Sequence, residues 1–189
     1  MKTIFSFLFI VVLAAGQLNG QVSGNNVTDV ILTGYSVKDY SSVPVTDQQI
    51  DLILKCGIKS PSSQNLQPWK FTVIRDEPSM KEIISDVVPG NVLIVISGVE
   101  PKQQGGNTPD FDCGLATSSM FVAAEGIGLG ARIYGSPVRN INANREVYQI
   151  PAGYRAVTVL RIGNINKSVD AVSGASPRKA VEEVVNYKK

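Results

Sequence analysis

A single stretch of eight residues, Val92 to Val99, constrains the fold of this chain more than any other. It reads VLIVISGV, and such an apolar run predicts a strand that is buried on both faces of a sheet. Two further strands are predicted over 69–75 (WKFTVIR) and 154–163 (YRAVTVLRIG). Helices are predicted over about 46–59, 79–88 and 110–127, and from Ser176-Pro177 onward. Strands separated by helices predict an α/β or α+β domain around one sheet.

The absence of histidine limits the chemistry that the side chains can perform. The chain has 189 residues and no histidine, which excludes Ser-His-Asp and Cys-His catalysis and most zinc sites. Its 18 basic and 16 acidic side chains give a net charge of +2, so nothing in the charge balance favours nucleic acid as a partner. Cys56 and Cys113 lie on predicted helices among apolar neighbours, which favours buried thiols over a disulfide. We therefore predict no metal site, no catalytic side chain and a bound cofactor.

The amino terminus has the pattern of a secretory signal. Lys2 precedes an apolar run from Ile4 to Ala15, and small residues follow at Ala14-Ala15-Gly16. This run is too short for a comfortable membrane span. We predict a signal peptide over 1–20, a polar linker over 21–33 and one domain over 34–189, in a protein that is exported to the periplasm or secreted.

The most informative motif is the stretch SPSSQNLQPW, from Ser60 to Trp69. Its hydroxyl, amide and backbone N–H groups are suited to reading the edge of a heterocycle, although the composition alone also fits an ordinary loop that ends a helix. The stretch resembles the A-P-S-x-x-N-x-Q-P-W signature of the FMN-dependent nitroreductase family. Four more segments resemble parts of that family, in the family's order along the chain. They are YSVKDY from Tyr35, Val43-Pro44-Val45 with the helix after it, GLATSSMFVAAEGIGLGARIYG from Gly114, and Arg178 near the carboxyl terminus. The resemblance covers roughly residues 30 to 187.

The resemblance implies an α+β, nitroreductase-like fold with a mostly antiparallel central sheet flanked by helices. It also implies FMN as the cofactor, with the reaction carried by the flavin, and a homodimer with FMN at its interface. Ser36, Lys38 and Arg178 would contact the phosphate end of FMN. The implied neighbours of the flavin ring are Pro61, Ser62, Ser63 and Asn65 on one side and the backbone of Tyr134, Gly135 and Ser136 on the other.

Two features depart from the usual family pattern or add to it. Gly34-Tyr35-Ser36 stands where the family has Arg-Arg-Ser, and Lys38 replaces a second arginine, which weakens the hold on a phosphate because lysine cannot chelate it. The stretch DAVSGAS from Asp170 resembles the flavinylation sequence D-x-x-[ST]-G-A-[ST]. That resemblance implies a covalent bond between the FMN phosphate and Ser176, while noncovalent FMN stays an alternative.

These observations lead to one functional prediction and two alternatives. The prediction is an exported FMN-dependent oxidoreductase that passes electrons to a small electron-poor substrate such as a nitroaromatic or a quinone. NAD(P)H is not expected outside the cytoplasm, so the electron donor is left open. One alternative is a flavin-carrying electron-transfer protein with covalent FMN at Ser176, and the other is a binding module on the same fold that has lost FMN.

Overall fold

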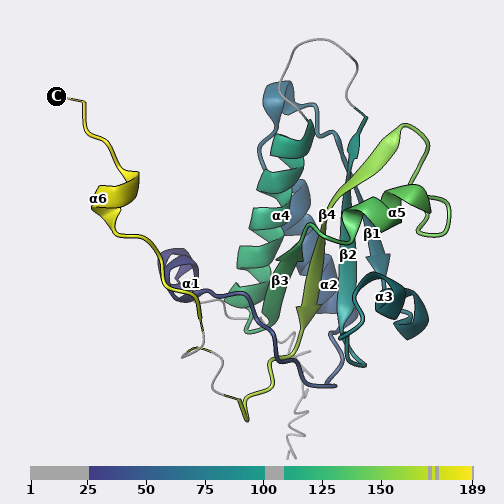
Figure 1. Cartoon of the computed structure of the whole chain (residues 1–189), viewed down its shortest axis with the longest axis horizontal. Coiled ribbons are helices and arrows are strands. Elements are labelled where there is room, and N and C mark those ends of the chain that lie inside the picture. Colours follow the sequence, from purple (N-terminus) through teal and green to yellow (C-terminus); the bar gives the residue numbers. More distant parts are fainter. Residues whose placement is uncertain (1–25, 101–108, 170–171, 173–174, 189) are drawn as a thin grey trace, which may run out of the picture.

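A computed structural model describes residues 26–100, 109–169, 172 and 175–188 of the chain (Figure 1). The predicted signal peptide and most of the DAVSGAS stretch lie outside these residues. Four strands form one sheet in the order β1-β2-β4-β3, and every neighbouring pair is antiparallel. The strands are β1 (Trp69–Ile74), β2 (Val92–Val99), β3 (Gly130–Tyr134) and β4 (Tyr154–Gly163). The predicted α+β fold with an antiparallel sheet is therefore confirmed.

Helices cover both faces of the sheet, as the apolar run at 92–99 requires. The helices are α1 (Val27–Thr33), α2 (Asp47–Ile58), α3 (Glu77–Ile83), α4 (Pro109–Gly126), α5 (Val138–Ala143) and α6 (Val181–Val184). Ile94 of β2 packs with α2 and α4 on one face. Its neighbour Leu93 packs with α3 and α5 on the other face, because successive side chains of a strand point to opposite sides.

The predicted helix over 46–59 and the three predicted strands are found in place. Thr46 caps α2 with a complete capping box: its hydroxyl accepts from the amide of Gln49, whose side chain accepts from the amide of Thr46. The prediction for the next helix is wrong at both ends. Asp76, not Ser79, is its cap, accepting from the Ser79 amide at 2.9 Å, and the helix ends at Ile83 rather than near residue 88.

Two predictions at the ends of the domain are also wrong. Residues Val27 to Thr33 of the predicted linker form helix α1, because Asn26 caps it and Val30 is buried against the end of α4. The last helix does not begin at Ser176-Pro177. It begins at Val181 after Ala180 and has only four residues, and Figure 1 shows it lying away from the sheet at the end of an extended segment.

The described residues hold no helix that is long and apolar enough to cross a membrane. They also hold no cluster of three or more Cys, Asp or Glu side chains that could bind a metal ion. Cys56 and Cys113 are both free thiols, and burial raises the pKa of the Cys113 thiol to about 12. Cys113 is therefore buried as predicted, whereas Cys56 is partly exposed.

Candidate functional site

One cavity lies between the first and the last segments of the folded domain. It has a volume of about 530 Å³ and lies between the end of α1, the segment that follows it, and the carboxyl-terminal segment. We call residues 34–38, which follow α1, the arm. The lining residues are Ile31, Leu32, Thr33, Gly34, Tyr35, Ser36, Lys38, Asp39, Val169, Val172, Ala175, Ser176 and Arg178. Four of the predicted FMN-contacting residues, Ser36, Lys38, Ser176 and Arg178, therefore lie around one space although they are up to 142 positions apart.

The polar groups of this cavity suit a phosphate. Lys38 and Arg178 are positively charged, and Asp39 is the one acidic residue that lines the cavity. Ser36 and Ser176 add two hydroxyl groups. Arg178 also donates to the carbonyl of Ser176 at 3.3 Å, which holds its guanidinium beside that serine. Cationic donors make the stronger hydrogen bonds to phosphate. The residues present therefore fit the phosphate end of FMN.

A carboxyl group of α4 holds the arm. The Oε1 atom of Glu125 accepts a hydrogen bond from the Tyr35 amide at 3.2 Å. Gly34 makes this approach possible, because a Cβ atom at that position would lie 2.1 Å from Glu125 Oε2. Burial raises the pKa of Glu125 to about 7, although the hydrogen bond from Tyr35 opposes the shift.

The predicted flavin loop is strained and is held by a second carboxyl group of α4. Gln64, Asn65 and Gln67 all have left-handed backbones, with φ of 51°, 57° and 47°. Such a cluster of strained residues that are not glycine is typical of binding sites. The Asp112 side chain, which is buried, accepts from the Ser63 amide at 3.2 and 3.3 Å.

Other contacts tie the same loop together. Ser62 Oγ accepts from the Gln67 amide at 3.0 Å. At the start of the loop, the Ser60 hydroxyl donates to that of Ser119, on α4, at 2.8 Å. Gln67 donates from its side chain to Asn65 at 3.3 Å, so it braces the loop.

The third predicted segment, Tyr134 to Ser136, begins at the last residue of edge strand β3. The carbonyl of Tyr134 accepts from the Thr158 hydroxyl at 3.1 Å, and the guanidinium carbon of Arg132 lies 4.8 Å from the centroid of the Tyr134 ring. Gly135 and Ser136 are exposed, and a Cβ atom on Gly135 would meet nothing within 4 Å. The backbone here is open to a ligand.

Within one chain, the arm and the strained loop lie at opposite ends of α4. Asp112 near its first residue holds the loop, and Glu125 near its last residue holds the arm. At a rise of 1.5 Å per residue, these two positions are about 20 Å apart. Pro61, Ser62, Ser63 and Asn65 do not line the cavity, and neither do Tyr134, Gly135 and Ser136.

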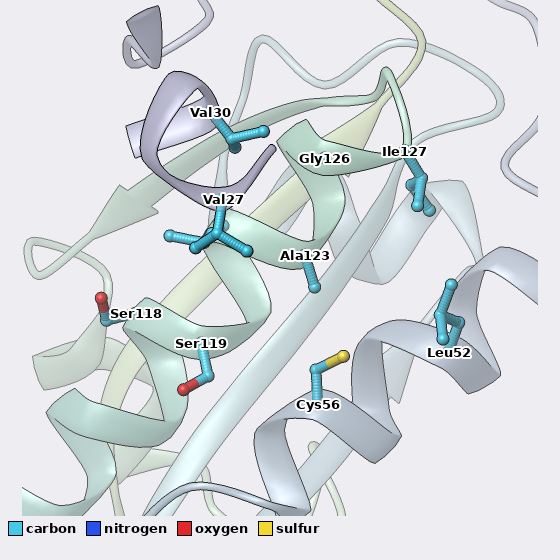
Figure 2. Close-up of a pocket in the computed structure, with 10 residues that line it drawn as sticks. Val27, Val30, Leu52, Cys56, Ser118, Ser119, Ala123, Gly126 and Ile127 are labelled. Carbon is cyan, nitrogen blue, oxygen red and sulfur yellow. The ribbon is translucent and has the colours of Figure 1, made fainter. Parts of the chain in front are cut away.

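A second, apolar cavity of about 520 Å³ lies between α1, α2 and α4. In Figure 2, Val27 and Val30 come from α1, Leu52 and Cys56 from α2, and Ala123 and Ile127 from α4 and the turn after it. Phe111, near the start of α4, is 64% exposed. Helix α4 is apolar around much of its circumference. A helix with this pattern is expected to be buried by protein on both sides.

Several known proteins are similar to this chain in sequence and fold. The Nitroreductase family model matches residues 31–89. A candidate NADH dehydrogenase/NAD(P)H nitroreductase of Archaeoglobus fulgidus is 29% identical over 143 residues, which cover 71% of this chain and 82% of that protein. The NADPH-flavin oxidoreductase of Vibrio harveyi is 26% identical over 61% of this chain and 55% of its own. The crystal structure of a candidate nitroreductase from Desulfovibrio desulfuricans, in complex with FMN, superposes with a TM-score of 0.73 at 25% identity, covering 87% of this chain and 98% of that one.

Proposed function

We propose that this chain, which carries a Nitroreductase family domain on a nitroreductase-like fold, is an exported FMN-dependent oxidoreductase that passes electrons to a small electron-poor acceptor such as a nitroaromatic or a quinone. The observation that carries the proposal is the cavity that Ser36, Lys38, Ser176 and Arg178 share. Their chemistry suits a phosphate. The resemblance to the family assigns Ser36, Lys38 and Arg178 to the phosphate end of FMN, and the resemblance to the flavinylation sequence assigns Ser176 to the same place.

The chain's own residues bind and orient the cofactor. Lys38 and Arg178 would neutralise the phosphate, and the hydroxyl of Ser36 would be able to donate to it. Bound FMN would supply the redox chemistry, accepting two electrons and passing them on. No side chain is required to act as an acid or base, which agrees with a chain that has no histidine.

We further propose that the working unit is a homodimer. The arm and the strained loop are about 20 Å apart along α4, so a second copy whose loop reaches the cavity of the first would complete the site. The second copy would also cover the exposed side of α4 and the apolar cavity beside it. The segment that carries α6 exposes Val181, Val184 and Tyr187, and these side chains suit contact with another subunit.

The position of Ser176 favours a second candidate function, a tethered-flavin electron carrier. Ser176 lines the cavity beside Arg178, where the phosphate is expected. A flavin transferase that used FAD would join the FMN phosphate to Ser176 Oγ and release AMP, and the serine proton would leave with it. A tether would retain the cofactor in an exported protein.

Acid precipitation of the mature protein tests these proposals. The protein is exported from a host that has a flavin transferase, and its absorption spectrum is recorded before and after precipitation. Flavin released into the supernatant would support a noncovalent oxidoreductase site and refute the tether. Flavin that stays in the pellet of the wild type and of Ser168→Ala, but not of Ser176→Ala, would support the tether. Ser168 is a matched control because it is an exposed serine outside the cavity.

The acceptor assay separates the enzyme from the carrier. The protein is reduced with dithionite, because an exported protein does not meet the cytoplasmic NAD(P)H pool, and is mixed with a nitroaromatic or a quinone. Fast reoxidation that saturates with acceptor concentration supports the enzyme, whereas slow reoxidation that does not saturate supports the carrier. If no flavin is bound in either form, even after reconstitution with FMN, both redox proposals are wrong.

A further inference from the structure

The two walls of the cavity around the four predicted phosphate-binding residues begin side by side. We call this cavity the phosphate cavity. One wall is the end of α1 with the arm and Asp39, and the other runs from Val169 to Arg178. Residues 39–41, which continue the arm, lie antiparallel to residues 164–166, which follow β4. We call these two short segments the base of the cavity.

Three backbone hydrogen bonds hold the base together and start the second wall. The Asn166 amide donates to the carbonyl of Asp39 at 3.0 Å. The Ser41 amide donates to the carbonyl of Asn164 at 2.8 Å. The carbonyl of Asn166 in turn accepts from the amide of Val169, the first residue of the second wall, at 3.2 Å. Because the arm leads directly into the base and Val169 is bonded to it, the base sets how far apart the two walls stand where they begin.

The side chain of Tyr40, in the middle of the base, is buried against the sheet. Tyr40 is 7% exposed, and the guanidinium carbon of Arg161, on β4, lies 4.1 Å from the centroid of its ring. Gly163 leaves room for the ring, because a Cβ atom there would lie 2.7 Å from Tyr40 Cδ1. The Tyr40 hydroxyl has no hydrogen-bond partner among the described residues. The ring therefore holds Tyr40 in place, through its stack on a cation that is shielded from water.

Arg161 is a fixed support for this ring. Its side chain is buried, and its Nε atom donates to Asn91 Oδ1 at 2.9 Å. Its two terminal nitrogens donate to Asp86, one to the carboxylate at 3.0 Å and the other to the carbonyl at 2.9 Å. A planar guanidinium that is bonded at all three nitrogens has little freedom to turn. The base is therefore joined to the sheet through the contact between one ring and one immobilised cation.

We propose that Tyr40 is a positioning residue for the cofactor phosphate, because its stack on Arg161 fixes the base. The base in turn fixes the separation of Lys38 from the wall that carries Arg178. This inference deepens the proposed function and rests on it for the identity of the ligand. A phosphate binds more tightly where both cations are held in place before it arrives, because less motion is lost on binding. Loss of the stack should therefore weaken FMN binding, although Tyr40 does not line the cavity.

Four variants separate the ring from its hydroxyl and from a general loss of stability. Tyr40→Leu removes the ring, Arg161→Met removes the cation beside it, and Tyr40→Phe removes only the unpartnered hydroxyl. Tyr148→Leu is a matched control, because Tyr148 is 4% exposed, belongs to the core on the α3 and α5 side of the sheet and does not line the phosphate cavity. If Tyr40→Leu does not fold, Arg161→Met tests the same stack from its other side.

Hydrogen exchange at the amides of Ser41 and Asn166 tests the hold on the base without FMN. Their protection, relative to that of the Ile94 amide in the central strand β2, is measured by NMR in the full mature protein. We expect this ratio to fall at least about fivefold in the two variants that break the stack, and to stay within about twofold of the wild type in the other two. A ratio that is unchanged when the stack is broken would overturn the inference.

Titration with FMN tests the role toward the phosphate. The protein is produced without a flavin transferase, so that FMN exchanges freely. Flavin fluorescence gives the dissociation constant, and the ³¹P chemical shift of FMN at saturation reports the surroundings of its phosphate. We expect the constant to rise roughly three- to thirtyfold in the two variants that break the stack, with a changed ³¹P shift, and to stay within about twofold in the other two. An equal loss of affinity in Tyr148→Leu and Tyr40→Leu would show a role in stability alone and overturn the positioning role.

The two measurements together separate this inference from the proposed function. Protection of the base that depends on the stack, in a wild type that binds no FMN, would refute the proposed function and the role toward phosphate, but not the hold on the base. Binding of FMN that keeps its affinity and its ³¹P shift when the stack is broken would refute the positioning role alone.

Discussion

Replacement of Asp112 by alanine should release the strained loop from α4. Its buried carboxylate accepts from the Ser63 amide at 3.2 and 3.3 Å, and a hydrogen bond to a charged group contributes about 1.5–3 kcal/mol. The loop needs such support, because each left-handed residue that is not glycine costs on the order of 1–3 kcal/mol, and Gln64, Asn65 and Gln67 are all of this kind. Without Asp112, the balance moves toward relaxed loop conformations.

The size of the effect on FMN follows from the same bond. At 1.4 kcal/mol for each factor of ten, a loss of about 1.5–3 kcal/mol corresponds to roughly 10- to 100-fold weaker binding. Asp112→Asn keeps an oxygen that can accept from the Ser63 amide, so it should recover most of the affinity. The surface variant Asp51→Ala, which removes only an exposed pair with Lys55, should leave the affinity unchanged.

Flavin fluorescence on titration with FMN measures these affinities, and urea unfolding measures the stability of each variant. An Asp112→Ala protein that unfolds cooperatively and binds FMN within twofold of the wild type would refute the reasoning. It would mean either that the loop keeps its conformation without Asp112 or that the loop does not contact FMN. Proteolysis at the loop separates these two readings, since a released loop is cleaved faster.

Three further predictions concern the rest of the domain. Gly34→Ala should lower the free energy of unfolding by about 1–3 kcal/mol, measured in urea, because the new Cβ would lie 2.8 Å from the backbone carbonyl oxygen of Val30 and would also displace the Glu125 carboxyl group. An unchanged midpoint would contradict the close approach. The free energy of unfolding of the wild type, relative to that of Glu125→Gln, should fall as the pH rises from 4.5 to about 7 and then level off. The reason is that Glu125 binds its proton more tightly in the folded state than in the unfolded state. A rise over this range in urea unfolding would contradict the raised pKa. Arg161→Met should lower the free energy of unfolding by about 1–3 kcal/mol, because Asn91 Oδ1 and the Asp86 carbonyl each lose the donor that they have at 2.9 Å. A loss below about 1 kcal/mol in urea would show that these bonds contribute little.

Much of the sheet and its largest helices could be predicted from local patterns. The strands at 92–99 and 154–163 have continuous or alternating apolar residues, and α2 has a capping box at Thr46. Each of these signals lies within the element that it predicts. Predicting these elements therefore required no knowledge of tertiary contacts.

The elements that were missed depend on distant contacts. Strand β3 has five residues, GARIY, and exists through pairing with β4 about thirty positions later. Helix α1 has the sequence VTDVILT, in which β-branched residues disfavour an isolated helix. It is stabilised by the Asn26 cap and by the burial of Val30 against α4. Tertiary packing overrides local propensity in both cases.

The residues of the candidate site were likewise predictable only where a local sequence pattern marks them. The serines, cations and loop motif could be proposed from the sequence because they lie in recognisable local patterns. Asp112 and Glu125 could not, because their partners are 49 and 90 positions away. A carboxyl group that accepts from a distant backbone amide leaves no local signal that distinguishes it from a surface acid.

The two missed carboxyl groups explain why α4 connects the parts of the candidate site. Cys113, Ala116 and Met120 bury one side of this helix against the sheet, so its two ends keep fixed positions relative to the domain. Asp112 at one end holds the loop, and Glu125 at the other holds the arm. Neither is needed to exchange a proton with a substrate when electrons move through a flavin. In a chain without histidine, we therefore expect Asp112 and Glu125 to act through the two backbone segments that they hold, the loop and the arm.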